Sequence, residues 1–302
     1  MAADAKAPSA DDKSYIRVTH DKEGNPLAME TSIVHLVPQG NDRPGLQVDL
    51  VSAVHVADQS YYDALNKRFD GYDAVLFELV APEGTVVPKG GLDRNRNALS
   101  AVQNGMKDLL ELEYQLTGVD YTKKNFVHAD LSPDEFLASM KEKGESFWEI
   151  FFRLMAAGMA KQAAGQKPPA EKNEHYWSAF GRILGSGDGQ DATSNAEILL
   201  ALVDPHRAIK LKRIMADQFS DMDILVTAFN GPNGSTLITE RNKAALKVLK
   251  QEIAAGKKKI AIFYGGGHMP DLEPRLSSEF QMKRGGIEWL EAWNLRDKSD
   301  KK

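Results

Sequence analysis

The chain has 302 residues, of which 42% are hydrophobic and 27% are charged, and its net charge is −5. This length and composition allow a buried globular core, while the negative charge argues against a nucleic-acid partner because no basic stripe is present to neutralise phosphates. The absence of cysteine excludes disulfides, thiolate metal ligands and thiol nucleophiles.

The first residues, 1–13, predict a disordered leader without the basic and apolar regions of a signal peptide. We therefore expect a mature exported protein slightly in preference to a cytoplasmic one. No stretch approaches the ~18 uninterrupted apolar residues of a membrane span, so no transmembrane segment is expected. The lysine-rich residues 297–302 predict a solvated tail. The sequence leaves the oligomeric state open.

Residues 14–37 predict a β-hairpin. A buried strand over residues 46–54, a helix over residues 58–69 and a second buried strand over residues 72–80 then form a βαβ unit. The Gly- and Pro-rich residues 82–96 run off the end of that strand as a loop. Loops at this edge of an α/β sheet commonly carry function.

The middle of the chain, residues 97–221, predicts a mainly helical insertion that caps the sheet. Within it, residues 125–130 are short and strand-like. Ser132 is the expected N-cap of a helix, with proline in the first turn and Glu135 three residues after the cap. The sheet is expected to resume after this insertion.

Beyond the insertion, residues 223–229 predict a strand, and Thr239 is the expected N-cap of a helix that reaches residue 255. A strand over residues 259–264, a short helix over residues 270–280 and a final strand over residues 286–293 complete the series. Together these elements predict one α/β domain over 14–296. Its fold is a central, mostly parallel sheet with an N-terminal β-hairpin and a helical cap insertion.

Three groups that bind metals or move protons follow predicted buried strands: His55, Glu78 and His268. Because open α/β sheets bind ligands outside the carboxyl ends of their strands, we expect these groups to share one site. Two histidines and one glutamate form the ligand set of a hydrolytic metal centre with an open position. The alternative is that both histidines are ordinary core residues, although a carboxylate in so apolar a strand must be paired or functional.

Arg241 stands near a predicted helix start, between Glu240 and Asn242, where a cation is unfavourable without an anionic partner. That partner could be a substrate carboxylate, Glu78 or a tetrahedral oxyanion.

The glycines before His268 could form an anion-binding nest of backbone N–H groups. His128, in the strand-like segment of the insertion, could join the site or lie in the core. The chain lacks the Gly-x-Ser-x-Gly elbow, which disfavours a serine hydrolase.

In this order, the motifs resemble those of the TraB/GumN/Tiki superfamily, over roughly residues 48–276. The matching segments are Val54-His55-Val56, Phe77-Glu78-Leu79, Glu240-Arg241-Asn242 and Gly265-Gly-Gly-His268 with Pro270. That family characteristically has two Gly-x-x-His motifs. Here the second is intact, and the first has Ser52 in place of glycine, which keeps the position small.

The resemblance implies an α/β fold whose members include Tiki-type metallopeptidases, some of them dependent on Mn or Co, and proteins proposed to inactivate peptide pheromones. Relatives include erythromycin esterases and haem-binding ChaN-like proteins. The predicted site has His55, His268 and Glu78 as ligands of a divalent metal (Mn, Co or Zn). Its catalytic residues are Glu78, Glu240 and Arg241, and its substrate-binding residues are Asn242, Gly265, Gly266, Gly267 and His128.

Two functions from different classes follow. The first is a metal-dependent hydrolase, specifically a Tiki-like metallopeptidase that cleaves exposed segments of a peptide or protein substrate with a metal-activated water. The second is a non-catalytic protein that binds or sequesters a peptide, a metal or haem in the same pocket.

Overall fold

The computed structural model describes residues 14–82, 84–89, 112–144, 208–210, 212–213, 216 and 234–297. The predicted leader over residues 1–13, the predicted strand over residues 223–229 and most of the predicted insertion lie outside the described residues.

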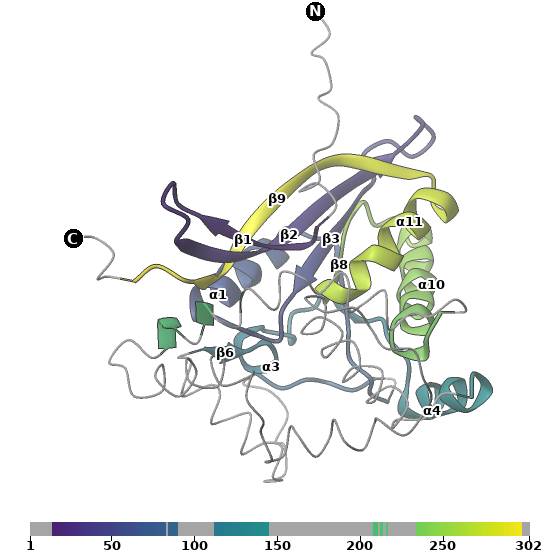
Figure 1. Cartoon of the computed structure of the whole chain (residues 1–302). Helices are drawn as coiled ribbons and strands as arrows, with labels where there is room; N and C mark the ends of the chain where they lie inside the picture. Colours follow the sequence, from purple (N-terminus) through teal and green to yellow (C-terminus); the bar gives the residue numbers. More distant parts are fainter. Residues whose placement is uncertain are drawn as a thin grey trace, which may run out of the picture.

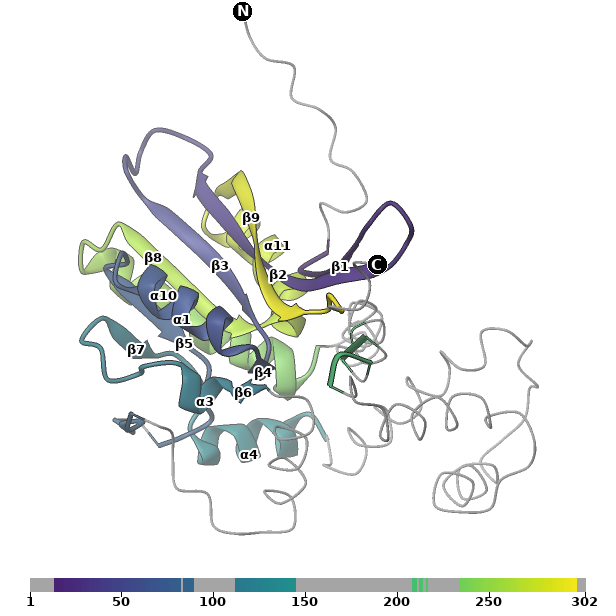
Figure 2. The same ribbon diagram turned by 90° about the vertical axis from the view of Figure 1, so that its left-hand side faces the viewer.

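A mixed seven-stranded sheet forms the centre of the protein (Figures 1 and 2). Its strand order is β1 (Ile16–His20), β2 (Pro26–Pro38), β3 (Gln47–Ala53), β8 (Lys259–Gly265), β5 (Ala74–Phe77) and β7 (Phe126–His128), and β9 (Met282–Asn294) also pairs with β2. The pairs β3–β8, β8–β5 and β5–β7 are parallel, whereas β2 is antiparallel to each of its neighbours. The predicted α/β fold class is confirmed.

Strand β2 organises the antiparallel half of the sheet. Its residues 28–31 pair with β1 and its residues 33–36 pair with β3, and both sets pair at the same time with β9. Because a strand has only two edges, β1 and β3 share one edge of β2 and β9 occupies the other.

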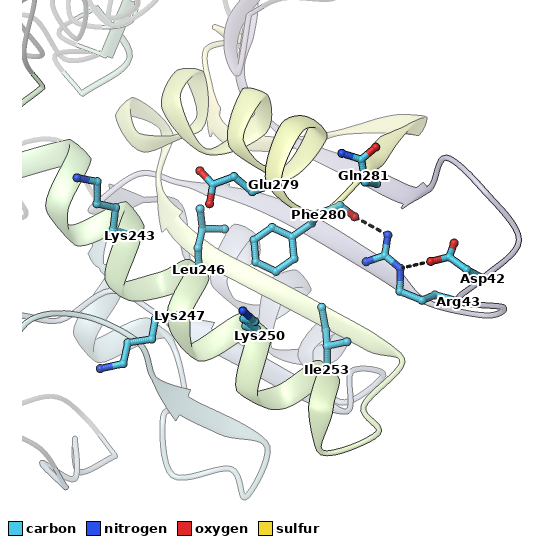
Figure 3. A pocket seen from close by; sticks show the side chains of 10 residues that line it. All are labelled: Asp42, Arg43, Lys243, Leu246, Lys247, Lys250, Ile253, Glu279, Phe280 and Gln281. Atoms are coloured by element: carbon cyan, nitrogen blue, oxygen red, sulfur yellow. Dashed lines mark hydrogen bonds and ion pairs between the residues drawn. The ribbon is translucent and has the colours of Figure 1, made fainter.

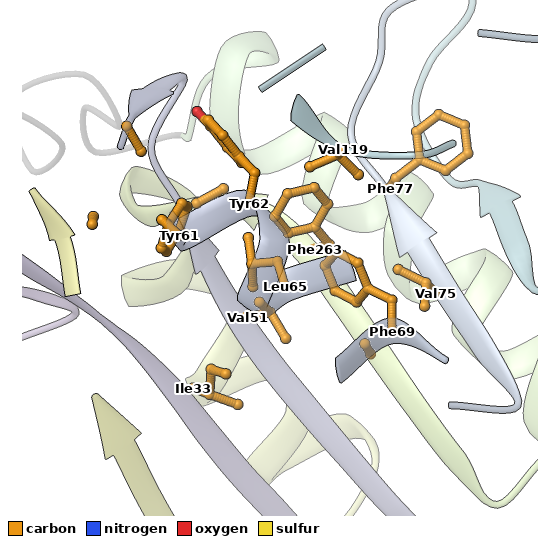
Figure 4. Close-up of a cluster of buried hydrophobic side chains, with 14 of the residues drawn as sticks. Ile33, Val51, Tyr61, Tyr62, Leu65, Phe69, Val75, Phe77, Val119 and Phe263 are labelled. Atoms are coloured by element: carbon orange, nitrogen blue, oxygen red, sulfur yellow. The ribbon is translucent and has the colours of Figure 1, made fainter. Parts of the chain in front are cut away.

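The parallel strands are covered on both faces, which explains their nearly continuous apolar sequences. Alternate side chains point to opposite faces. One face packs against α1 (Gln59–Phe69) through Val51, Val75 and Phe263 (Figure 4). The other face packs against α10 (Arg241–Ala254) and α11 (Met269–Glu279) through Leu50, Leu76 and Ile262. The predicted helix between the first two buried strands is thus confirmed.

A small two-stranded sheet of β4 (Val56–Ala57) and β6 (Glu113–Tyr114) lies beside the carboxyl end of β3, and α3 (Gln115–Gly118) follows it. Helix α4 (Pro133–Glu142) begins as predicted, because Ser132 and Glu135 cap it reciprocally and proline occupies its first turn. Strand β7 belongs to the main sheet. The strand-like segment predicted over residues 125–130 is therefore confirmed, although it lies in the main sheet and not in a helical cap.

The entry into α10 differs from the sequence prediction. A π-helical turn, η2 (Thr236–Glu240), precedes α10, and the Ser235 hydroxyl accepts from Ile238 N–H as the cap. The Thr239 hydroxyl instead accepts from the backbone N–H of Ser235 at 3.2 Å. Thr239 is therefore not the N-cap, and Arg241 lies more than a turn inside the helical segment. Turns of this type are frequent at functional sites.

The parallel strands all end at one edge of the sheet. His55, Glu78 and His268 follow β3, β5 and β8, and His128 is the last residue of β7. Within the described part of the chain, no helix is long and apolar enough to cross a bilayer.

Candidate functional site

The carboxylate of Glu78 is the centre of the candidate site. Glu78 follows β5, and its side chain is only 10% exposed. Its Oε2 accepts from the backbone N–H of Gly265, at the end of β8, at 2.8 Å. Its Oε1 accepts from the Arg241 guanidinium at 2.7 Å. The parallel pairing of β5 with β8 thus places the Glu78 carboxylate between the end of β8 and Arg241, the first residue of α10.

Arg241 bridges two carboxylates. Its Nε donates to Asp130 Oδ1 at 2.9 Å, and its Nη2 donates to Asp130 Oδ2 at 2.6 Å, in addition to the bond to Glu78. The Asp130 side chain is fully buried, and that of Arg241 is 9% exposed. Burial alone would lower the pKa of Arg241, but Asp130 and Glu78 outweigh it and raise that pKa. Glu78 is thus one of the anionic partners that the sequence predicted for Arg241, and Asp130 is a partner that the sequence did not predict.

Asn242 orients the ring of His268. The amide nitrogen of Asn242 donates to the His268 carbonyl at 3.2 Å and to Asp271 at 2.8 Å, which fixes the direction of the amide. Its Oδ1 therefore faces His268 Nδ1, 2.7 Å away, and accepts the ring proton. In the neutral ring, Nε2 is then the unprotonated nitrogen, and it lies 3.5 Å from Glu78 Oε1.

Gln115 holds His55 in a similar way. The Oε1 atom of Gln115 lies 3.2 Å from His55 Nδ1, and its Nε2 donates to the Tyr121 hydroxyl at 3.0 Å. The backbone N–H of Gln115 also donates to the His55 carbonyl at 2.9 Å. Gln115 is buried, whereas His55 is exposed. Because Nδ1 of His55 faces Gln115, the other ring nitrogen, Nε2, points away from Gln115.

Charges around Glu78 keep it ionised. Burial alone would raise the pKa of this carboxyl group, but His268, Arg241 and His55 outweigh burial and hold the pKa well below its usual value. A group with so low a pKa is a weak proton acceptor at neutral pH. Glu78 is therefore better suited to hold a cation than to move a proton.

The residues fit a divalent metal in their chemistry but are not assembled around one. Over the described ranges, no three His, Asp or Glu side chains are grouped closely enough to hold a metal ion. His268 Nε2 and Glu78 Oε1 are nevertheless near neighbours, and a carboxylate keeps acceptor capacity beyond the bonds to Arg241 and Gly265. For His55 to become the third ligand, its exposed ring must move toward this pair.

Two predicted site residues lie apart from the Glu78 cluster. Glu240 pairs with Lys243 at 3.0 Å and with Lys143 at 3.2 Å. His128 Nε2 lies 2.6 Å from the Leu79 carbonyl oxygen, and its ring contacts Phe77. Both residues line a pocket between α4 and α10 that Asp130 also borders.

Two of the three glycines before His268 make contacts within the protein. The N–H of Gly265 serves Glu78, and a Cβ atom on Gly266 would come within 3.0 Å of Ile16. This close packing, rather than an open anion nest, explains glycine at position 266.

Asp130 and Gln115 are the site residues that the sequence did not reveal. Asp130 is a buried carboxylate just after a strand, the same signal that identified Glu78. Gln115 carries no such signal, because its role depends on the pairing of β4 with β6.

Comparisons with known proteins gave no match to any family model, to any curated protein or to any solved structure. The resemblance to the TraB/GumN/Tiki superfamily therefore stays a prediction from the motifs.

Proposed function

We propose that this chain is a metal-dependent hydrolase, and specifically a Tiki-like metallopeptidase that cleaves exposed segments of a peptide or protein. The observation that carries the proposal is the pairing of His268 with Glu78. A neutral ring with its proton on Nδ1 would point a lone pair at a buried carboxylate 3.5 Å away. This arrangement is repulsive unless a proton or a metal cation lies between the two groups.

In the proposed site, His268, Glu78 and His55 hold the ion, and Arg241 holds Glu78. A divalent ion bound there would lower the pKa of a water molecule and polarise a carbonyl group. The amides of Asn242 and Gln115 support this assignment, because ligating histidines almost always donate their second ring N–H to an orienting group. The bonds that Glu78 already accepts from Arg241 and Gly265 favour the ligand role over the role of base.

Reconstitution with Mn²⁺, Co²⁺ or Zn²⁺ tests the metal site directly. Isothermal titration calorimetry and elemental analysis should give one ion per chain, and His268→Ala should abolish binding. His35→Ala, a matched variant at the opposite end of the strands, should bind normally. If none of the three ions binds stoichiometrically, the metal site does not exist.

A screen of the reconstituted protein against a peptide library then tests hydrolysis. Metal-dependent cleavage that is lost in His268→Ala supports the peptidase. Metal binding without cleavage of any peptide would contradict it.

A second function has one observation in its favour. Glu78 already accepts bonds from Arg241 and Gly265, and its low pKa makes it a poor base. Those properties suit a site that binds a peptide, a metal or haem without catalysis. Stoichiometric binding with no turnover would select this function.

The helical cap over residues 97–221 is also part of the proposal. If the block depends on the sheet for burial of its apolar faces, it should aggregate when expressed alone. Cooperative unfolding of the isolated block, with dispersed amide NMR signals, would contradict this dependence.

A further inference from the structure

A groove of about 610 Å³ runs along α10 on the side that faces the end of α11 (Figure 3). Lys243, Lys247 and Lys250 lie along the α10 side of the groove, and Leu246, Ile253 and Phe280 provide its apolar surface. These helix positions recur at intervals of three and four residues, so they form one stripe along α10. Lys243 and Lys247 also line the pocket between α4 and α10 that Asp130 borders, so the groove adjoins that pocket.

The opposite wall of the groove is held in place by the protein. Arg43 donates to the Phe280 carbonyl, and its Nε pairs with Asp42 at 3.3 Å (Figure 3). Gln281 has a φ of 52°, the left-handed conformation that glycine usually adopts after a helix. Its carbonyl accepts from the Gln39 N–H at 2.8 Å. A wall fixed in this way loses little conformational freedom when a partner binds.

The charges of the groove are unbalanced in favour of cations. Its two carboxylates already have partners, since Asp42 pairs with Arg43 and Glu279 pairs with Arg275. Lys247 and Lys250 are exposed, and neither has an ion-pair partner among the residues that the structure describes. This local excess of positive charge stands out because the whole chain carries −5.

We infer that this groove is a docking surface for an acidic peptide segment that carries a large apolar side chain. Lys247 and Lys250 complement its carboxylates, whereas Lys243 already pairs with Glu240. The surface of Leu246, Ile253 and Phe280 accepts its apolar residue. The eleven residues from Lys243 to Ile253 span about 15 Å of helix, the length of about five extended residues. A peptide suits this groove better than a nucleic acid, because the aliphatic residues Leu246 and Ile253 suit an apolar side chain, whereas single-stranded nucleic acids stack on successive aromatic side chains.

This inference names a substrate class for the proposed peptidase and in that respect rests on the proposed function. A segment docked along α10 would extend toward the pocket between α4 and α10, which is bordered by Asp130, the partner of Arg241. Docking itself requires neither metal nor turnover. Binding and cleavage can therefore succeed or fail independently.

Fluorescence polarisation on the full chain without added metal tests the docking. The probe is a short fluorescein-labelled peptide of Asp and Glu with one central Phe. Lys247→Glu/Lys250→Glu should weaken binding by about tenfold or more. The matched variant Lys67→Glu/Lys124→Glu makes the same charge change at exposed lysines outside the groove and should leave the affinity unchanged. Replacing Phe in the peptide by Ser should also weaken binding, without any change to the protein.

Three results would overturn the inference. Equal loss of affinity in both double variants would indicate a general effect of net charge. Equal affinity for the Phe and Ser peptides would show that the apolar surface is unused. Equal affinity for a single-stranded DNA of similar length would assign the lysines to phosphates. If docking succeeds and no peptide is cleaved in the presence of metal, only the proposed peptidase function fails.

Discussion

Each end of the parallel strands buries a carboxylate beside a histidine, and the two ends balance its charge differently. At the carboxyl end, Glu78 pairs with Arg241, a permanent cation. At the amino end, Asp49 is 1% exposed and accepts from Tyr72 at 2.6 Å, with His35 Nδ1 2.9 Å away. Among the described residues, no lysine or arginine contacts Asp49.

The difference shows what each end is suited to do. A buried guanidinium keeps the carboxylates around it ionised over the whole physiological range. Neutral donors and a histidine stabilise a carboxylate by hydrogen bonds and add a full positive charge only when the ring is protonated. The carboxyl end is therefore arranged to present fixed negative charge to a cation, whereas the amino end mainly joins β2, β3 and the start of β5.

The largest expected effect is the loss of Arg241. Arg241→Met would leave Glu78 and Asp130 buried without a counter-ion, which typically costs about 3–5 kcal/mol of unfolding free energy. At the amino end, Arg68→Met removes an ion pair with Glu288 that is roughly half exposed, so we expect a change of about 0–1 kcal/mol. Urea denaturation of both variants measures the two changes in unfolding free energy. Similar losses in the two variants would contradict the difference between the two ends.

The next effect concerns the amino end. Tyr72→Phe removes one hydrogen bond to the Asp49 carboxylate and should cost about 1.5–3 kcal/mol of unfolding free energy. Burial, followed by the charge of Asp49, raises the pKa of Tyr72, so the hydroxyl stays protonated as a donor. Metal affinity should be unchanged in this variant. A loss of metal in Tyr72→Phe would mean that the two ends are coupled.

The next effect concerns metal binding, which should weaken when the site histidines lose the amides that orient them. Asn242→Ala and Gln115→Ala each release one Nδ1 atom and should weaken metal binding by about 10–100-fold. Gln47→Ala, which removes an amide from the amino-end network, is the control and should not change the affinity. Competition with a fluorescent chelator gives the metal dissociation constants of the three variants. Normal affinity in both site variants would argue against the proposed ligands.

The smallest effect is a dependence on pH. The folded-state pKa of Glu78 lies below its usual value of 4.5, so its contribution to stability is present above pH 4.5 and is lost as the pH falls through the folded-state pKa. The stability difference between the wild type and Glu78→Gln should therefore shrink on acidification, by at most about 1.4 kcal/mol per pH unit. Thermal unfolding at several pH values measures it. A stability difference that grows on acidification would contradict a lowered folded-state pKa of Glu78.

The apolar runs of the sequence predicted the parallel strands and the meeting of Glu78 with His268, because continuous apolar runs and strand ends are local properties. The partners of those residues depend on long-range pairing. Asp130 reaches Arg241 across 111 positions, and Gln115 reaches His55 across 60. The misplaced N-cap at Thr239 has a local cause, since Ser235 competes for the same role and begins a wider turn.

The pairing of β2 with β9 also bears on how the chain reaches its native state. Met29 contacts Trp293 and Pro38 contacts Met282, so residues from the two ends of the domain lie in adjacent strands. During synthesis, one edge of β2 must stay open until residue 294 has left the ribosome. Such late, long-range closure slows folding and exposes a strand edge to other nascent chains. Chaperone demand should therefore peak late in translation, and premature termination before β9 should yield aggregates rather than a smaller folded protein.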